Sequence, residues 1–251
     1  MTSVSWLSCA SDGAHVTRIA AVAVLVSLAA WAGPASAQLG ATDVAGVRLG
    51  ASADEVEATL RALDPRFKFL KIYFPDANGK ASTSVAAIKA AVQQSTDLRG
   101  IDWKRPDGFA VYFDEGTNRA FAIYRQVAHA QGISIGQTEE ALTKKYGPTV
   151  GSYPGIYIRN VDLAGKTTAS CGGAGFGWQG GPGGYDPRCA QALKVQFDPI
   201  RPGVAAGFQT WLLDHRLAQA AIQASQAKQQ AAAQDAARKQ QDAVRGNRPA
   251  I

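Results

Sequence analysis

Alternating apolar and polar positions predict two antiparallel hairpins in this chain. Phe109–Asp114 and Leu193–Asp198 follow the period of two that is typical of a strand with one buried face. A turn and a second apolar run follow each of them, over Ala120–Val127 and Ala206–Leu213. Phe67–Phe74 is a further strand candidate. The hydrophobic pattern therefore indicates a sheet with antiparallel pairs.

A short motif that occurs twice predicts the start of a helix before each hairpin. Gly46–Val56 and Gly132–Leu142 share the pattern G-[VI]-x-[LI]-G-x-[ST]-x-[DE]-x-[VL]. We expect Ser52 in the first copy and Thr138 in the second to cap a helix, because their hydroxyls can accept hydrogen bonds from the first turn. Ser52 and Glu55 also have the spacing of a capping box.

Two further signals place the other helical elements of the two halves. The Tyr146–Pro148 segment contains a glycine and a proline, and predicts the end of the second motif's helix, which we expect to be the shorter of the two. Val85, Ile88 and Val92 recur at helical spacing, so Ser82–Gln94 is predicted to be an additional helix in the first half.

The spacing between motif and hairpin favours an internal duplication. The second glycine of the motif precedes the last phenylalanine of the alternating strand by 63 residues in the first copy (Gly50 to Phe113) and by 61 in the second (Gly136 to Phe197). The alternative is chance, since many α/β proteins contain helices and hairpins. We expect an α+β fold with two tandem helix-plus-antiparallel-sheet repeats, over 38–130 and 131–214.

The C-terminal segment, 215–251, has a different composition. Leu217–Val244 consists mostly of Ala, Gln, Lys, Arg and Asp, which are largely good helix formers, with few large apolar residues. A solvated helix is the expected form. Two interpretations stay open: an arm that contacts an anionic surface, or a solubilising tail without a partner.

The composition of the chain is most informative about its N-terminal segment. With 46% hydrophobic and 18% charged residues, the chain of 251 residues is neither mainly disordered nor a multi-pass membrane protein. The uncharged run Ile19–Gly33 follows Arg18, and Ala35 and Ala37 fit the small-residue positions before a signal-peptidase cut. We predict that 1–37 is a cleaved signal peptide; an uncleaved membrane anchor is the alternative.

Two cysteines remain after such a cleavage. Cys171 and Cys189 are predicted to form a disulfide, because an exported chain meets an oxidising compartment and a structural zinc site would need four ligands. The segment that they enclose contains eight glycines and two prolines, which disfavours a regular helix or a central strand. If a contact surface exists on this loop, Phe176, Trp178 and Tyr185 are the candidate binding residues.

Few residue patterns point to a reaction. The chain has neither an HExxH metal motif nor a nucleophile elbow, so we predict no catalytic residue, no metal and no cofactor. His129 follows an apolar run and could act as a general base opposite a carboxylate, or be an ordinary surface histidine. The net charge of +6 is spread along the chain, which disfavours nucleic acid as a partner.

The paired motifs carry a resemblance to known proteins. The segments GVRLGASADEVEATL and GISIGQTEEALTKKYGP resemble the opening helix motif of the barrel-assembly outer-membrane lipoproteins (the SmpA/OmlA group) and of the tandem-repeat proteins that inhibit β-lactamases. The resemblance implies helices packed on an antiparallel sheet, and protein binding through a sheet face or loops. It transfers no functional residue, and this chain lacks the lipoprotein cysteine after its apolar run.

Together these patterns predict a secreted or periplasmic, non-enzymatic binding or adaptor protein of the cell envelope. Its partner would be an envelope protein or an anionic envelope polymer, and the mature chain would have no transmembrane segment. Two alternatives stay open: an envelope glycan hydrolase that uses paired carboxylates, and an inhibitor of a secreted enzyme.

Overall fold

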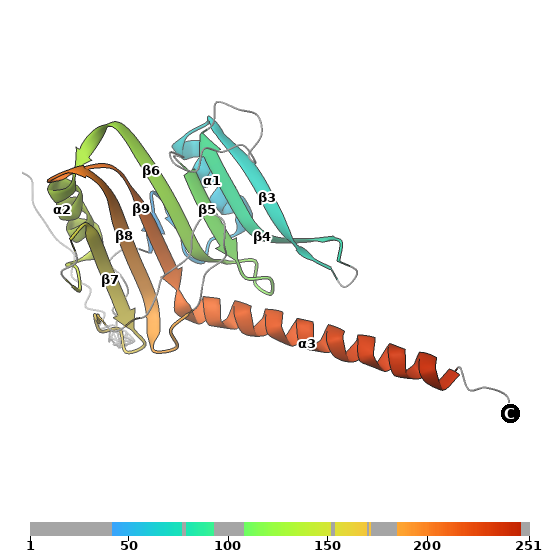
Figure 1. The fold of residues 1–251 in the computed structure, drawn as a ribbon. Coiled ribbons are helices and arrows are strands. Elements are labelled where there is room, and N and C mark those ends of the chain that lie inside the picture. Colours follow the sequence, from blue (N-terminus) through green and yellow to red (C-terminus); the bar gives the residue numbers. More distant parts are fainter. Residues whose placement is uncertain are drawn as a thin grey trace, which may run out of the picture. The chain divides into compact units, whose positions relative to one another are not determined.

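A seven-stranded antiparallel sheet forms the centre of the fold (Figure 1). The computed structural model describes residues 42–76, 79–92, 108–151, 154–169, 171 and 185–246. The strand order is β3-β4-β5-β6-β9-β8-β7. The strands are β3 (Phe67–Pro75), β4 (Ala81–Val92), β5 (Gly108–Phe113), β6 (Ala120–Ser134), β7 (Ile156–Asp162), β8 (Cys189–Arg201) and β9 (Val204–Asp214). A short ribbon of β1 (Asp43–Val44) and β2 (Val47–Arg48) precedes them. The predicted α+β class is confirmed, whereas the predicted signal peptide, 1–37, lies outside the described residues.

The first helix, α1 (Ala53–Leu63), begins where the capping box places it. The Ser52 hydroxyl accepts a hydrogen bond from the Glu55 backbone N–H at 3.3 Å, and the Glu55 carboxylate accepts one from the Ser52 N–H at 2.7 Å. Two otherwise unsatisfied backbone donors are thereby paired, so a local signal of four residues fixes the helix start.

The second helix, α2 (Ile135–Tyr146), begins one turn earlier than predicted. Its N-cap is Ser134, whose hydroxyl accepts from the Gln137 N–H at 3.4 Å. Thr138 lies inside the first turn and donates its hydroxyl to the Ser134 carbonyl at 2.8 Å. The prediction that Thr138 caps the helix was therefore wrong, because a serine at the end of β6 reaches the free N–H groups first. The earlier start makes α2 12 residues long against 11 for α1, so the prediction of a shorter second helix was also wrong.

The predicted helix over Ser82–Gln94 was also wrong: the chain through Val92 forms β4. β4 pairs with β3 on one side and with β5 on the other, and these ladders satisfy its backbone along both edges. Ile88 and Ala90 point to one face, and Ala87 and Ala91 point to the other, all of them buried. An apolar run that is buried on both faces imitates helical periodicity, since both kinds of position are apolar.

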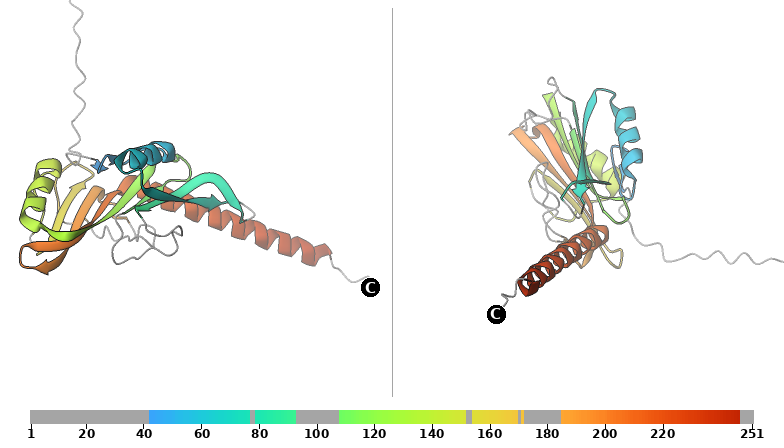
Figure 2. Two further views of the ribbon diagram at one scale, coloured as in Figure 1. Left: turned by 90° about the horizontal axis from the view of Figure 1, so that it is seen from above. Right: turned by 90° about the vertical axis from the view of Figure 1, so that its right-hand side faces the viewer.

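One face of the sheet, here the helix face, is covered by α1 and α2 (Figure 2). Val56 and Leu60 of α1 pack there against the main core of the protein. Phe109 and Phe113 of β5 and Leu193 of β8 belong to the same cluster and are fully buried. Both halves of the chain therefore share one continuous core beneath their helices.

The other face, here the second face, holds a smaller aromatic cluster. Tyr124 and Trp211 lie across from each other on β6 and β9, with ring centroids 5.6 Å apart. Tyr112 joins them, and Ala218 of α3 (His215–Gly246) packs against the same cluster. The base of α3 is thus anchored to this face.

Beyond its first two turns, α3 is solvated. Every side chain described between Gln223 and Ala243 is exposed, as predicted for a solvated C-terminal helix. Among the helices in the described ranges, none is both long enough and apolar enough to cross a membrane. Lys228 forms an ion pair with Glu115 in the turn between β5 and β6.

The predicted disulfide is present. Cys171 and Cys189 are bonded, with their Cα atoms 5.8 Å apart and a sequence separation of 18. Cys189 is the first residue of β8, so the bridge ties the start of a core strand to the preceding segment.

Candidate functional site

A groove opens where β6 and β9 separate. The two strands pair regularly from Ala122 to Ala128 and again at Ile133 and Ser134, whereas residues 129–132 of β6 lie opposite the single residue Ala206. This bulge leaves a groove of about 620 Å³. Such a volume is in the range of about 300–1,000 Å³ that is typical of small-molecule sites.

Two glycines shape the bulge. A Cβ atom on Gly207 would lie 2.0 Å from the Val127 carbonyl oxygen, so only glycine allows the strands to approach so closely there. Gly132 has a φ of +76°, and a Cβ on it would lie 2.8 Å from the Val204 side chain. The groove is therefore a consequence of sequence at these two positions.

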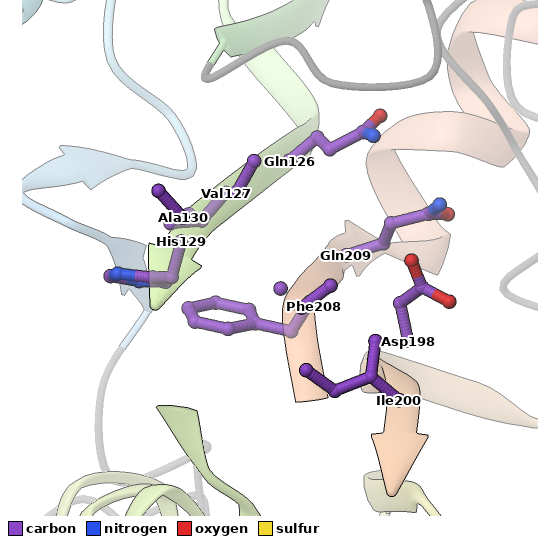
Figure 3. A pocket seen from close by; sticks show the side chains of 11 residues that line it. Gln126, Val127, His129, Ala130, Asp198, Ile200, Phe208 and Gln209 are labelled. Carbon is purple, nitrogen blue, oxygen red and sulfur yellow. The ribbon is translucent and has the colours of Figure 1, made fainter. Parts of the chain in front are cut away.

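Three glutamines form a row across the second face, beside the groove. Gln126 of β6 lies directly opposite Gln209 of β9, which lies opposite Gln196 of β8. We call these three residues the glutamine row. In the neighbouring register position, Asp198 lies opposite Gly207, which lacks a side chain. Figure 3 shows the amide ends of Gln126 and Gln209 and the carboxylate of Asp198 pointing to the same side of the strands.

The described residues engage the polar groups of this row only in part. The Tyr124 hydroxyl donates to the Gln126 side-chain oxygen at 2.8 Å, which orients that amide. Burial raises the pKa of Tyr124 to about 12, so its hydroxyl stays a donor at neutral pH. The side chains of Gln196, Gln209 and Asp198 make no hydrogen bond to any residue in the described ranges.

The structure places His129 in the groove, and no carboxylate among the described residues pairs with it. His129 is exposed in the bulge, and it points away from Asp198, with Phe208 between them (Figure 3). This arrangement agrees with a surface histidine rather than with a general base held by an acid across the sheet.

A second histidine, His215, is buried at the base of α3 and was not singled out from the sequence. Its Nδ1 accepts a hydrogen bond from the Asp186 N–H at 3.0 Å, and its Nε2 has no partner among the described residues. Burial lowers the pKa of this imidazole below its ordinary value of 6.5, although Asp186 and Asp214 act to raise it. His215 is therefore neutral and structural at physiological pH.

The two buried carboxylates beside His215 make hydrogen bonds that stabilise local structure. Asp214 accepts hydrogen bonds from the backbone N–H groups of Arg216 and Leu217, which begin α3. Asp186 accepts from the guanidinium of Arg188, with an ion-pair distance of 2.8 Å. Both groups thus already serve as a helix cap and a turn anchor.

The predicted loop residues are placed only in part. Tyr185 is half-buried and packs against the aromatic cluster on the second face. Phe176 and Trp178 lie outside the described residues. The structure therefore brings one of the three candidate binding residues to the second face, and that residue serves packing.

The two edges of the sheet differ. At β7, the Val150 N–H donates to the Ile158 carbonyl at 2.7 Å, and the Thr168 N–H donates to the Asn160 carbonyl at 3.1 Å. At β3, within the described part of the chain, no backbone hydrogen bond joins 68–75 to a segment on the outer side. Within the described ranges, one edge is covered and the other is open.

The open edge also carries exposed apolar side chains. Leu70, Ile72 and Tyr73 of β3 are exposed by 40%, 38% and 41%. Lys68 is exposed and makes no ion pair with a described residue, whereas Lys71 pairs with Glu57 at 2.7 Å. The strand contains two lysines and no carboxylate.

Comparisons with protein-family models, with curated proteins and with solved structures found no match to this chain. Its resemblance to the outer-membrane lipoproteins and the β-lactamase inhibitors stays a prediction based on short motifs. Sequence reasoning missed the glutamine row and the open edge, because both depend on which strands become neighbours. The polar positions of β6, β8 and β9 were the signal that could have suggested the row.

Proposed function

We propose that this chain is an exported, non-enzymatic binding protein of the cell envelope that accepts an extended segment of a partner protein along β3. The observation that carries the proposal is the open β3 edge with its exposed apolar side chains. Proteins normally cover or blunt such an edge, because its free N–H and C=O groups pair readily with another chain.

The charge of the edge selects the kind of partner. The strands β3 and β4 contain three lysines and no carboxylate. Lys71 is paired with Glu57 of α1, whereas Lys68 has no described counter-ion. An acidic, extended segment with apolar side chains would complement both features. A second copy of this chain fits less well, since edge-to-edge pairing would bring lysines close to lysines.

Export is supported by two features. The 1–37 segment has the pattern of a signal peptide, and a disulfide between Cys171 and Cys189 fits an oxidising compartment. The periplasm or the extracellular space is therefore the proposed location. In this setting the +6 net charge would also favour acidic partners.

We also propose that the two halves arose by duplication of one unit. The chain passes from α1 to β4, β5 and β6, and later from α2 to β7, β8 and β9. The strands β6 and β9, the last of each set, are neighbours at the centre of the sheet. The one-turn difference in helix start and the additional strand β3 would then be later changes.

The binding proposal is tested by photo-crosslinking in the envelope of the producing cell. A photoreactive phenylalanine analogue replaces Leu70 on β3 or, as the matched control, Leu163, which is exposed by 60% in the turn after β7. We expect a discrete adduct from position 70 alone, to an acidic segment of one partner. Equal adducts from both positions, or none from position 70, would contradict the proposal.

A synthetic peptide with the crosslinked partner sequence provides the second step. We expect Lys68→Glu to weaken its binding to the mature chain about tenfold or more, because the charge contact becomes repulsive. Lys166→Glu, at an exposed turn position, is the matched control and should bind as the wild type does. If the partner is a secreted enzyme, its activity with and without this chain decides between adaptor and inhibitor.

A further inference from the structure

The glutamine row is separate from the β3 edge. Its three side chains come from β6, β9 and β8, whereas β3 lies at the far end of the same sheet, with β4 and β5 between. Ligand binding at the row would therefore be independent of the proposed protein partner.

The spacing of the row matches an extended polymer. Neighbouring strands lie about 4.8 Å apart, so three amides in adjacent strands span about 10 Å. This length is comparable to that of a disaccharide unit. Each primary amide offers donors and an acceptor in one plane, so the row can pair with a ligand that has both kinds of group at regular intervals.

Small residues separate the row from the bulge. Ala128 and Gly207 lie next to Gln126 and Gln209 along their strands, and Asp198 lies opposite Gly207. A methyl group and a hydrogen atom thus occupy the positions between the row and the bulge. At Gly207 the Val127 carbonyl oxygen fills the position of a Cβ, so a ligand at this end of the row meets backbone rather than a side chain.

The charges of the lining exclude some ligands. Neither lysine nor arginine lines the groove at the bulge, and Asp198 is the one acidic residue among its described lining residues. Along the row itself, Lys194 lies two positions from Gln196 on the same face, over the Trp211 ring, and Asp198 lies two positions away on the other side. One charge of each sign thus flanks the row, so an uncharged ligand is favoured. Asp198 can instead accept hydrogen bonds from hydroxyl groups.

We propose that the glutamine row, with Asp198, binds an uncharged glycan that carries N-acetyl groups. The amide of an N-acetyl group offers the same donor and acceptor pair as the glutamine amides and can form paired hydrogen bonds with them. An unacetylated glucan offers hydroxyls alone, and an extended peptide offers amides at a shorter repeat, on alternating sides.

The test uses the full mature chain and isothermal titration calorimetry with chitotetraose, an oligomer of N-acetylglucosamine. We expect saturable binding, and at least tenfold weaker binding for Gln209→Leu, which removes the amide at the centre of the row. Gln223→Leu on the exposed part of α3 is the matched control and should bind as the wild type does. Circular dichroism and a melting curve establish that both variants are folded.

Each alternative outcome contradicts the proposal in a recognisable way. Equal affinity for cellotetraose would overturn the assignment to N-acetylated glycans. Tighter binding of an uncharged peptide than of chitotetraose would overturn the assignment to glycans. An unchanged affinity in Gln209→Leu, or no binding up to about 10 mM, would overturn the site itself. Because crosslinking at Leu70 does not involve the row, these outcomes are distinguishable from failure of the protein-binding proposal.

Discussion

His215 is the first residue of α3 and is almost fully buried, with 1% of its surface exposed. Its unprotonated Nδ1 receives the Asp186 N–H, so a proton on that atom would break the contact between the cystine-bearing turn and α3. The charged groups that face it are Asp186 and Asp214, which already hold Arg188 and the first turn of α3. Desolvation lowers the pKa of the imidazole by more than these two carboxylates raise it.

This contact predicts a pH dependence of stability. The unfolded chain protonates the imidazole near its ordinary pKa of 6.5, and the folded chain does so at lower pH. The free energy of unfolding should therefore fall as the pH drops below about 6.5. His215→Asn keeps an acceptor near the position of Nδ1 but does not titrate, so its melting temperature should decrease less between pH 7 and pH 5. The exposed residue His129, changed to Asn, is the control; a His215→Asn profile parallel to the wild type would contradict the account.

Gly207 gives a prediction about packing. Gly207→Ala places a methyl group against the Val127 carbonyl, so the two strands must move apart. We expect a loss of about 1–3 kcal/mol in the free energy of unfolding, measured by urea denaturation. Gly136→Ala in α2, where a Cβ meets open space, should have no effect or stabilise slightly. Equal stability of the two variants would show that the bulge adapts freely.

At the scale of elements, α3 is anchored by its first turns alone. Leu217, Ala218 and Ala221 touch the second-face cluster, and the solvated remainder makes one exposed ion pair, from Lys228 to Glu115, among the described contacts. Deletion of 223–251 should therefore change the free energy of unfolding by less than about 1 kcal/mol. A much larger loss in thermal denaturation would show that the distal helix contributes to the folded core.

The elements that could be predicted from the sequence are those fixed by local contacts. The capping box at Ser52 and the stop at Gly147 were placed correctly, because their hydrogen bonds join residues within one turn. The start of α2 was misplaced because two hydroxyls, Ser134 and Thr138, compete for the same turn. Residues 82–92 were mistaken for a helix because their burial depends on β3 and β5, which local periodicity does not contain.

The candidate sites also depend on contacts between distant segments, which the sequence pattern does not contain. Gln126, Gln196 and Gln209 are far apart in the chain and become a row through the register of three strands. The β3 edge is open because of the strand order, and no residue within β3 indicates which strand lies at the end of a sheet. By contrast, the cystine between Cys171 and Cys189 was predictable, since the expected removal of 1–37 leaves two cysteines, which have one pairing.

At the scale of the whole molecule, β6 joins the two halves. It runs from Ala120 to Ser134, pairs with β5 and then with β9, and passes across the expected boundary between 130 and 131. Together with the shared helix-side core, this pairing makes the sheet continuous. A change that destabilises one half should therefore lower the free energy of unfolding of the whole fold.

The disulfide tests this continuity. Its removal in a Cys171→Ala, Cys189→Ala variant opens a loop of 18 residues and should lower the free energy of unfolding by about 3 kcal/mol in one cooperative transition. The intact mass of the mature wild type should be lower by two hydrogens than that of its reduced form. Two thiols that react with an alkylating agent before reduction would contradict the bridge.

The most direct test of the central claim is hydrogen–deuterium exchange of the mature chain, alone and with the partner peptide identified by crosslinking at Leu70. Binding of an extended segment along the open edge predicts slower exchange in Phe67–Pro75, with no change in Ile156–Asp162 at the covered edge. Unchanged exchange in β3 with a saturating partner, or protection confined to another surface, would contradict the account.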